Sequence, residues 1–127
     1  MVRHFKPLSS DLIEALPIGC AGCVFWETPE RLDFACRSKC DERLAREWVD
    51  RVRVEWGDCG RAAVEEGQVL GFIKYAPPSF FPQARVMPAG PPDDDAVLIS
   101  CMHIAEDARR RGLGKVLLQV ALRDLVT

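Results

Sequence analysis

Long apolar stretches and an excess of basic residues are both missing from this chain of 127 residues. No apolar stretch approaches the length that crosses a bilayer, and residues 1–16 lack the basic-then-apolar layout of a signal peptide. The net charge of -2 gives no general attraction to nucleic acid. With 48% hydrophobic and 28% charged residues and no internal repeat, residues 1–127 are typical of one globular, cytoplasmic domain that binds neither membrane nor nucleic acid.

The two best-known phosphate-binding loops are absent too, although one segment is suited to phosphate. Residues 109–115 read Arg-Arg-Arg-Gly-Leu-Gly-Lys. A Walker loop needs glycine at position 109 and Ser or Thr at position 116, and the Rossmann glycine order is also missing. Glycines at the N-terminus of a helix nevertheless let backbone N–H groups converge on an anion. The alternative is an ordinary strand-to-helix turn with solvated arginines.

Apolar spacing predicts the elements on either side of this turn. Residues 96–104 are almost all apolar, too much so for a half-exposed strand, and predict a short buried one. After the turn, apolar residues recur at helical spacing, at Leu113, Val116, Leu117, Val120, Ala121 and Leu125.

The upstream part of the chain predicts three more strands and two more helices. Residues 1–6 suggest a strand and residues 9–16 a short helix. A longer helix begins near residues 38–41 and ends before Gly57, with Leu44, Ala45, Trp48, Val52 and Trp56 on one side.

Two strands, residues 61–64 and 69–76, are joined through a turn at Glu66-Gly67. Residues 77–95 read as a loop rich in Pro, Gly and Asp. We expect the aromatic residues Phe25, Trp26, Trp48 and Trp56 to lie in the core.

The pattern Arg-x-x-Gly-x-Gly, given by Arg109, Gly112 and Gly114, resembles the acetyl-CoA motif of the GNAT N-acetyltransferases. The order of predicted elements also matches the opening of the GNAT fold. More narrowly, residues 20–27 (Cys-Ala-Gly-Cys-Val-Phe-Trp-Glu), 55–60 and 75–78 resemble an actinobacterial-type subgroup of the family. The resemblance implies an α/β fold in three layers, with a mixed, mostly antiparallel sheet flanked by helices.

The resemblance also implies a cofactor and a reaction, namely transfer of an acetyl group from acetyl-CoA to an amine acceptor. The pantetheine arm and the developing oxyanion would bind backbone groups of Met102, His103 and Ile104. The pyrophosphate would bind the N–H groups of Arg111, Gly112, Leu113, Gly114 and Lys115, with Arg109 and Arg110 adding charge.

Three side chains are candidates for the general base: Glu27, His103 and Glu106. A solvated or packing role is the alternative for each, and an ordered water can replace a dedicated base in this family. Relatives use a tyrosine from a later helix to protonate the leaving thiolate. The single tyrosine here, Tyr75, belongs to a predicted strand, so we expect it to pack. We expect the loop at residues 75–82, with Phe80 and Phe81, to contact the acceptor.

The family fold continues into a fifth strand, whereas this sequence stops in a predicted helix at Thr127. The resemblance therefore implies a fragment, a degenerate acetyltransferase, or a sheet that a second chain or a homodimer completes.

Six cysteines in a chain without a signal peptide are not expected to form a disulfide framework. Cys20-x2-Cys23 followed by Cys36-x3-Cys40 is close to the spacing of a four-thiolate structural zinc site, although Cys59 competes as a ligand. Free thiols are the alternative, and Cys101 is expected in the core. A zinc-stabilised binding module without catalysis is therefore the second functional hypothesis.

Overall fold

A computed structural model describes residues 3–16, 26–27, 42–86, 92–93 and 95–126 of the chain. Within these residues, four strands form one sheet in the order β1-β2-β3-β4, and each neighbouring pair is antiparallel. The strands are β1 (Arg3–Pro7), β2 (Gly60–Glu65), β3 (Gln68–Ala76) and β4 (Leu98–Ile104). The predicted strands are therefore present, and the α/β fold with helices flanking an antiparallel sheet is confirmed.

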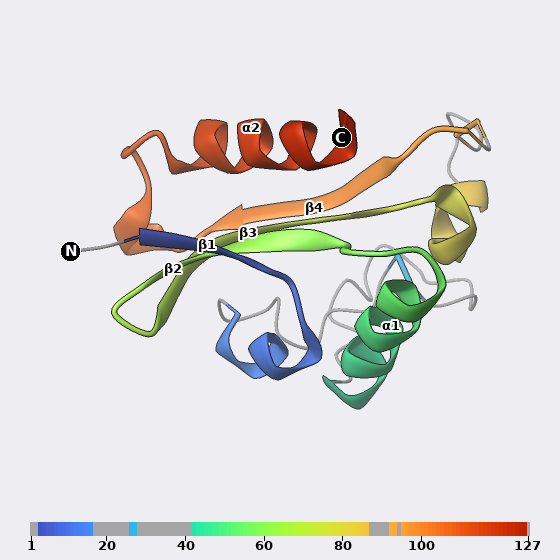
Figure 1. Ribbon diagram of the computed structural model, residues 1–127, viewed down its shortest axis with the longest axis horizontal. Coiled ribbons are helices and arrows are strands. Elements are labelled where there is room, and N and C mark those ends of the chain that lie inside the picture. Colours follow the sequence, from blue (N-terminus) through green and yellow to red (C-terminus); the bar gives the residue numbers. More distant parts are fainter. Residues whose placement is uncertain (1–2, 17–25, 28–41, 87–91, 94, 127) are drawn as a thin grey trace.

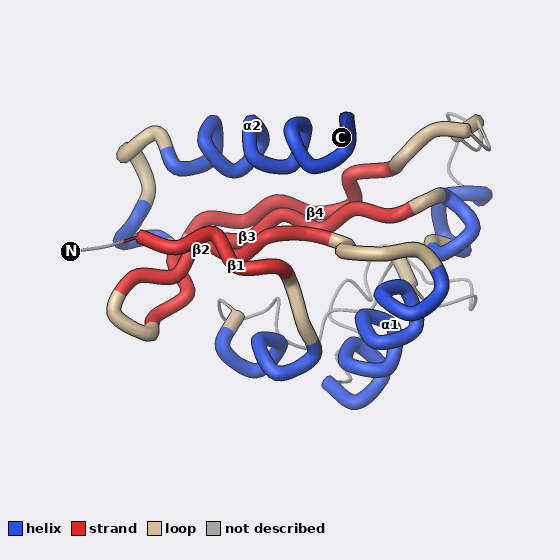
Figure 2. The backbone as a smooth tube through the Cα atoms, in the orientation of Figure 1, coloured by secondary structure: helices blue, strands red, loops and turns tan. Residues whose placement is uncertain are grey.

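The sheet lies between two layers of helices (Figures 1 and 2). One face carries α1 (Glu42–Glu55) and the short 3-10 helix η1 (Ser10–Ala15), which also contact each other. The other face carries α2 (Leu113–Val126), which contacts β2, β3 and β4. No helix among the described residues is long and apolar enough to cross a bilayer.

Each helical layer covers its own hydrophobic cluster. The cluster on the α1 side contains Trp48 and Val52 of α1, together with Phe72 and Phe81. Phe72 belongs to the face of β3 that points to this side. The cluster on the α2 side contains Ile73 and Tyr75 of β3, together with Leu113, Leu117 and Ala121 of α2. Because strand side chains alternate between the two faces, β3 supplies Phe72 to one cluster and Ile73 to the other.

The predicted turn at Glu66-Gly67 joins β2 to β3. Both residues have positive φ, 53° and 77°, which is the backbone of the two-residue hairpin turn that matches strand twist. The prediction from the Glu-Gly pair is thus confirmed, and Glu66 adopts the left-handed conformation without being glycine.

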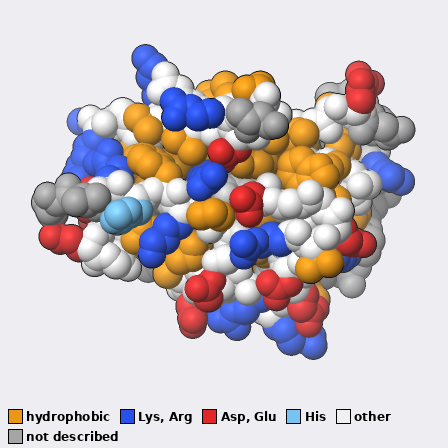
Figure 3. Space-filling view, in the orientation of Figure 1, with side chains coloured by type: hydrophobic (Ala, Val, Ile, Leu, Met, Phe, Trp, Pro, Cys, Tyr) orange, Lys and Arg blue, Asp and Glu red, His pale blue; other side chains and the backbone are white. Residues whose placement is uncertain are grey.

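The prediction that residues 96–104 form a fully buried strand is wrong in its burial. The strand exists, but Ile99 is 38% exposed and Met102 47% exposed. A continuous apolar run suits a strand with neighbours on both sides, whereas β4 is the edge of the sheet within the described part of the chain. Leu118 and Leu122 of α2 are exposed as well. On the face shown in Figure 3, hydrophobic side chains also reach the surface between α2 and the sheet.

Two further expectations need correction. Trp56 was expected in the core but lies just after α1 and is 40% exposed, with its ring edge-on to Tyr75. The loop after β3 contains two 3-10 turns, η3 (Pro78–Phe80) and η4 (Pro82–Val86). Phe81 in this loop is fully buried, with its ring centroid 5.1 Å from that of Trp48, so the predicted acceptor contact is wrong for this side chain.

Candidate cofactor and catalytic site

The turn between β4 and α2 presents backbone N–H groups that donate no hydrogen bond to a described residue. A short 3-10 helix, η5 (Glu106–Ala108), follows β4, and the chain then turns into Leu113. Among the described residues, no hydrogen bond is donated by the N–H groups of residues 110–115, while Val116 donates to the carbonyl of Gly112 at 3.2 Å. The first N–H groups of a helix have no partner within the helix, so they are available to a ligand.

The backbone of this turn is shaped by two left-handed residues. Gly112 has φ 72°, and a Cβ built on it would meet no atom within 4 Å, so open space lies beside the amides. Arg110 has φ 69°, a conformation that usually costs a non-glycine residue about 1–2 kcal/mol. An arginine kept at such a position is consistent with a use for its charge.

The cations of the turn fall into two groups. Arg109 donates from Nε to the carbonyl of Ile104 at 3.0 Å, and Arg111 donates to that of Asp107 at 3.4 Å. These two arginines thus brace the backbone between β4 and α2. Arg110 and Lys115 are exposed and form no ion pair with a described residue, so their charge is available to an anion.

Strand β4 leads from this turn along the sheet edge. A Cβ on Gly114 would lie 3.8 Å from Met102 and 3.9 Å from Ile104, so both side chains point toward α2. His103 pairs in register with Phe72 and therefore points to the opposite face. Lys74 pairs with Cys101 and Tyr75 with Ile99, which makes Ser100 the extra residue of a bulge.

Glu27 forms a buried ion pair with Lys74 of β3. The Glu27 side chain is 4% exposed and that of Lys74 is 12% exposed. The Lys74 ammonium also lies 5.3 Å from the centre of the Trp48 ring. The second carboxylate oxygen, Oε2, is buried and has no hydrogen-bond partner among the described residues. Such atoms are rare in folded proteins, which makes Oε2 a candidate for a chemical role.

His103 and Glu106 lie elsewhere, in a pocket of about 510 Å³ beside the turn between β4 and α2. This pocket, which also takes in Arg109, is lined by η1, the start of β3 and the end of β4. Glu27 is not among its lining residues. The structure therefore divides the three predicted base candidates between two places.

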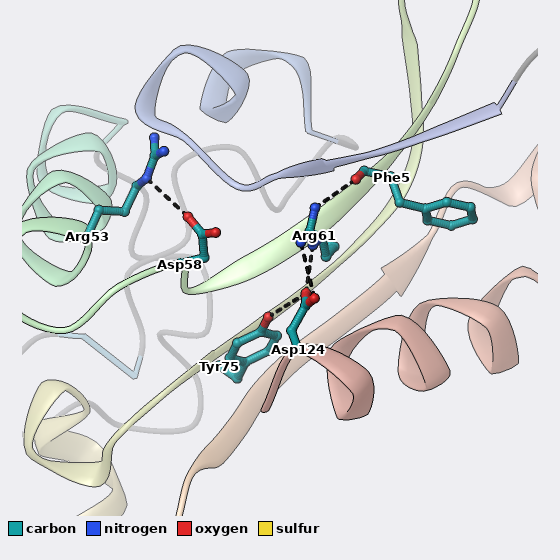
Figure 4. Close-up of polar contacts among 6 residues, drawn as sticks. All are labelled: Phe5, Arg53, Asp58, Arg61, Tyr75 and Asp124. Carbon is teal, nitrogen blue, oxygen red and sulfur yellow. Dashed lines mark hydrogen bonds and ion pairs between the residues drawn. The ribbon is translucent and has the colours of Figure 1, made fainter. Parts of the chain in front are cut away.

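A second groove, of about 370 Å³, lies at the other end of α2 and contains residues that the sequence did not single out. Arg61 and Asp124 meet there, and Asp124 accepts a hydrogen bond from Tyr75 at 3.4 Å (Figure 4). Tyr75 is 1% exposed, as expected for a packing residue, and its burial raises its pKa to about 12. No sequence period links these residues, since each lies on a different element.

The predicted zinc ligands Cys20, Cys23, Cys36 and Cys40 lie outside the described residues, so zinc stays a prediction. In the described part of the chain, no group of three or more His, Cys, Asp or Glu is arranged to hold a metal. Cys59 is a buried free thiol there. Burial raises the pKa of Cys59 to about 11. Cys101 is only partly buried at the sheet edge, so its expected place in the core is half correct.

Comparisons with known proteins point to one family. Residues 24–127 match the model of the acetyltransferase (GNAT) family. A GCN5-related N-acetyltransferase from Ralstonia eutropha JMP134 has a similar structure, with a TM-score of 0.58 and 22% identity over 98% of this chain and 76% of that one. Naa20 from Chaetomium thermophilum, solved with a bisubstrate analogue, gives a TM-score of 0.50 and 16% identity over 95% of this chain and 54% of that one. No curated protein matches the sequence.

Proposed function

This chain belongs to the GNAT acetyltransferase family, and from that premise we propose that it binds acetyl-CoA and transfers the acetyl group to an amine. The observation that carries the proposal is the set of unengaged backbone N–H groups at residues 110–115. We assign the pyrophosphate to the N–H groups of residues 111–115, with Arg110 and Lys115 adding positive charge. Bound acetyl-CoA supplies a thioester that is already activated for acyl transfer.

Strand β4 is proposed to hold the pantetheine arm. Its edge is open within the described residues, so the N–H and C=O of Met102 and the N–H of Ile104, which face away from β3, are suited to bind amides of the arm. The backbone groups of His103 face Phe72 of β3 instead, and the carbonyl of Ile104 accepts from Arg109. Gly114 lies over Met102 and Ile104, so the arm starts beside the turn. An extended arm with two amide units spans on the order of 15 Å, as about four to five residues of a strand do.

The length of the arm decides which of the three base candidates lies level with the thioester. Counting back along β4 from the turn, the thioester would lie level with residues 99–101, where the bulge at Ser100 interrupts the pairing. Lys74 pairs with Cys101, so the Glu27–Lys74 pair lies at this level on the α1 side. His103 and Glu106 lie at the phosphate end instead. We therefore propose that Oε2 of Glu27 accepts a proton from the attacking amine, while Lys74 holds Oε1.

The test of cofactor binding is the rise in melting temperature that acetyl-CoA gives to the protein, since a ligand selective for the native state must stabilise it. We expect Gly112→Asp to abolish this rise. Gly67→Asp is the matched control, because Gly67 also has positive φ, 77°, and also has open space where a Cβ would lie. Loss of the rise in both variants, or in neither, would exclude residues 110–115 as the binding site.

Acetyl transfer is tested on the full-length gene product by thiol release in the presence of a panel of amines. Turnover by the native protein and its loss in Glu27→Gln are expected. Acetyl-CoA binding without turnover of any amine would instead favour the non-catalytic binding module.

A further inference from the structure

The pocket beside the phosphate turn combines both signs of charge with an apolar wall. It lies on the α1 side of the sheet and measures about 510 Å³. Glu106 and Arg109 contribute opposite charges, His103 and Gln68 contribute further polar groups, and Leu16 and Val69 contribute apolar surface. A concave site of this size with a few converging polar groups is typical of small-molecule binding.

The two charges of the pocket do not neutralise each other. Neither the Glu106 carboxylate nor the Arg109 guanidinium forms an ion pair with any described residue. Toward the described part of the chain Arg109 uses only Nε, which donates to the carbonyl of Ile104, so its two terminal nitrogens are left for another partner. One carboxylate and one guanidinium in the same pocket are therefore both able to bind groups of a ligand.

We propose that this pocket binds a small zwitterion, an α-amino acid with an apolar side chain. Glu106 receives its ammonium group, Arg109 receives its carboxylate through the terminal nitrogens, and Leu16 and Val69 contact its side chain. Charge-assisted hydrogen bonds of this kind are the strong ones, and the paired donors of a guanidinium suit a carboxylate. The site lies at the phosphate end of β4, away from the level of the thioester, so the bound amino acid is not the acetyl acceptor.

Occupancy of the pocket is coupled to the phosphate turn. Glu106 and Arg109 belong to the segment that connects β4 to Arg110, and Arg109 fixes this segment to Ile104. A ligand that holds both side chains restrains the backbone whose amides face the pyrophosphate. Because coupling between two sites is reciprocal, the amino acid and acetyl-CoA should change each other's affinity by the same factor.

The test is calorimetric titration of the full chain with three probes of similar shape: leucine, 4-methylpentanoate and 3-methylbutylamine. Leucine should bind saturably, and each analogue, which lacks one charge, should bind about tenfold more weakly or worse. In Glu106→Gln the preference for leucine over 4-methylpentanoate should disappear. In Arg109→Gln the preference over 3-methylbutylamine should disappear.

Asp107→Asn is the matched control, because it removes one charge from the neighbouring residue, which does not line the pocket. Its affinity for leucine should equal that of the native chain. Equal binding of the three probes, no saturable binding of leucine, or an equal loss in Asp107→Asn would overturn the proposal. Acetylation of leucine, detected by mass, would overturn the assignment as a non-substrate site. The titration outcomes do not depend on whether acetyl-CoA binds, so this proposal and the proposed function can fail separately.

Discussion

Arg61 of β2 donates two hydrogen bonds, of 2.7 and 3.1 Å, to the carboxylate of Asp124 near the end of α2 (Figure 4). The same guanidinium donates to the carbonyl of Phe5 in β1 at 3.0 Å. The hydrogen bond to Asp124 raises the pKa of Arg61, so the guanidinium stays protonated. One side chain thereby connects β1, β2 and α2, the helix whose other end forms the proposed phosphate site.

We expect Arg61→Lys to lower the free energy of unfolding by about 1 kcal/mol, because an ammonium cannot reproduce the paired donors of the guanidinium. The pair is about three-quarters shielded, with side chains 22% and 26% exposed. Arg51→Lys is the control, since Arg51 pairs with Glu55 at 3.7 Å on the exposed side of α1. There the change should stay below about 0.5 kcal/mol. Urea unfolding curves of the two variants compare the effects, and equal losses would deny Arg61 a special role.

The left-handed backbone of Arg110 allows its charge to be tested apart from its strain. In Arg110→Gly, relief of the positive φ, about 1 kcal/mol, is offset by the greater backbone entropy of unfolded glycine. We expect the stability of this variant to be nearly unchanged, while the affinity for acetyl-CoA falls about threefold to tenfold. Arg110→Ala loses the same charge but keeps the strain.

The two Arg110 variants should therefore bind acetyl-CoA equally weakly. Titration calorimetry measures this, and thermal unfolding gives their stabilities. Native affinity in either variant would show that this charge does not face the ligand.

The sequence was sufficient to predict the elements because their signals are local. Apolar spacing changes from continuous to helical on either side of residues 109–115, and the Glu66-Gly67 pair fixes a hairpin. Burial of β4 was predicted wrongly because it depends on what lies beside the strand, which the strand's own residues do not encode. Trp56 follows the helical spacing of α1 but lies just beyond its last residue, Glu55.

The candidate site was predictable only in part for the same reason. The glycines of the turn indicate the proposed phosphate site by their spacing, within a few residues. Glu27 and Lys74 are 47 residues apart, and Arg61 and Asp124 are 63 apart. No periodicity connects such pairs, so only the fold brings them together. Glu27 was a candidate from its residue type, whereas its partner carried no signal.

The buried pair of Glu27 and Lys74 allows a structural role to be separated from a chemical one. Lys74→Met should lower the free energy of unfolding by about 3 kcal/mol, because a buried carboxylate is left without a counter-charge. The double variant Glu27→Gln with Lys74→Met should recover most of this loss, since both charges are gone. Denaturant unfolding of the two single variants and the double variant completes the cycle.

Acetyl transfer should behave differently in the same variants. If Oε2 of Glu27 accepts the proton, the double variant remains inactive although it is stable, with kcat lower by about 10²-fold or more. Acetyl-CoA should still bind to it, because the phosphate turn is unchanged. Recovery of turnover together with stability would reduce Glu27 to a structural residue.

Stability at high pH should report the burial of Tyr75. Its pKa is raised from 10.0 to about 12, first because burial disfavours the phenolate and then because of the charge of Asp124. The unfolded chain loses this proton near pH 10 and the folded chain only near pH 12, so the unfolded state binds fewer protons between these values. The stabilisation is thus complete below pH 10 and falls as pH rises to 12, by on the order of 2 kcal/mol.

In Tyr75→Phe this part of the loss should be absent. At pH 7 the substitution should lower the free energy of unfolding by less than about 1 kcal/mol, because the removed hydrogen bond is long, at 3.4 Å. The Cys59 thiol adds a similar decline between pH 9.0 and about 11, which the native chain and Tyr75→Phe both retain as an internal reference. Urea midpoints measured every half unit from pH 8 to 12 separate the contribution of Tyr75 from that of Cys59. If the midpoints of the native chain and Tyr75→Phe change identically above pH 10, Tyr75 ionises freely in the folded protein.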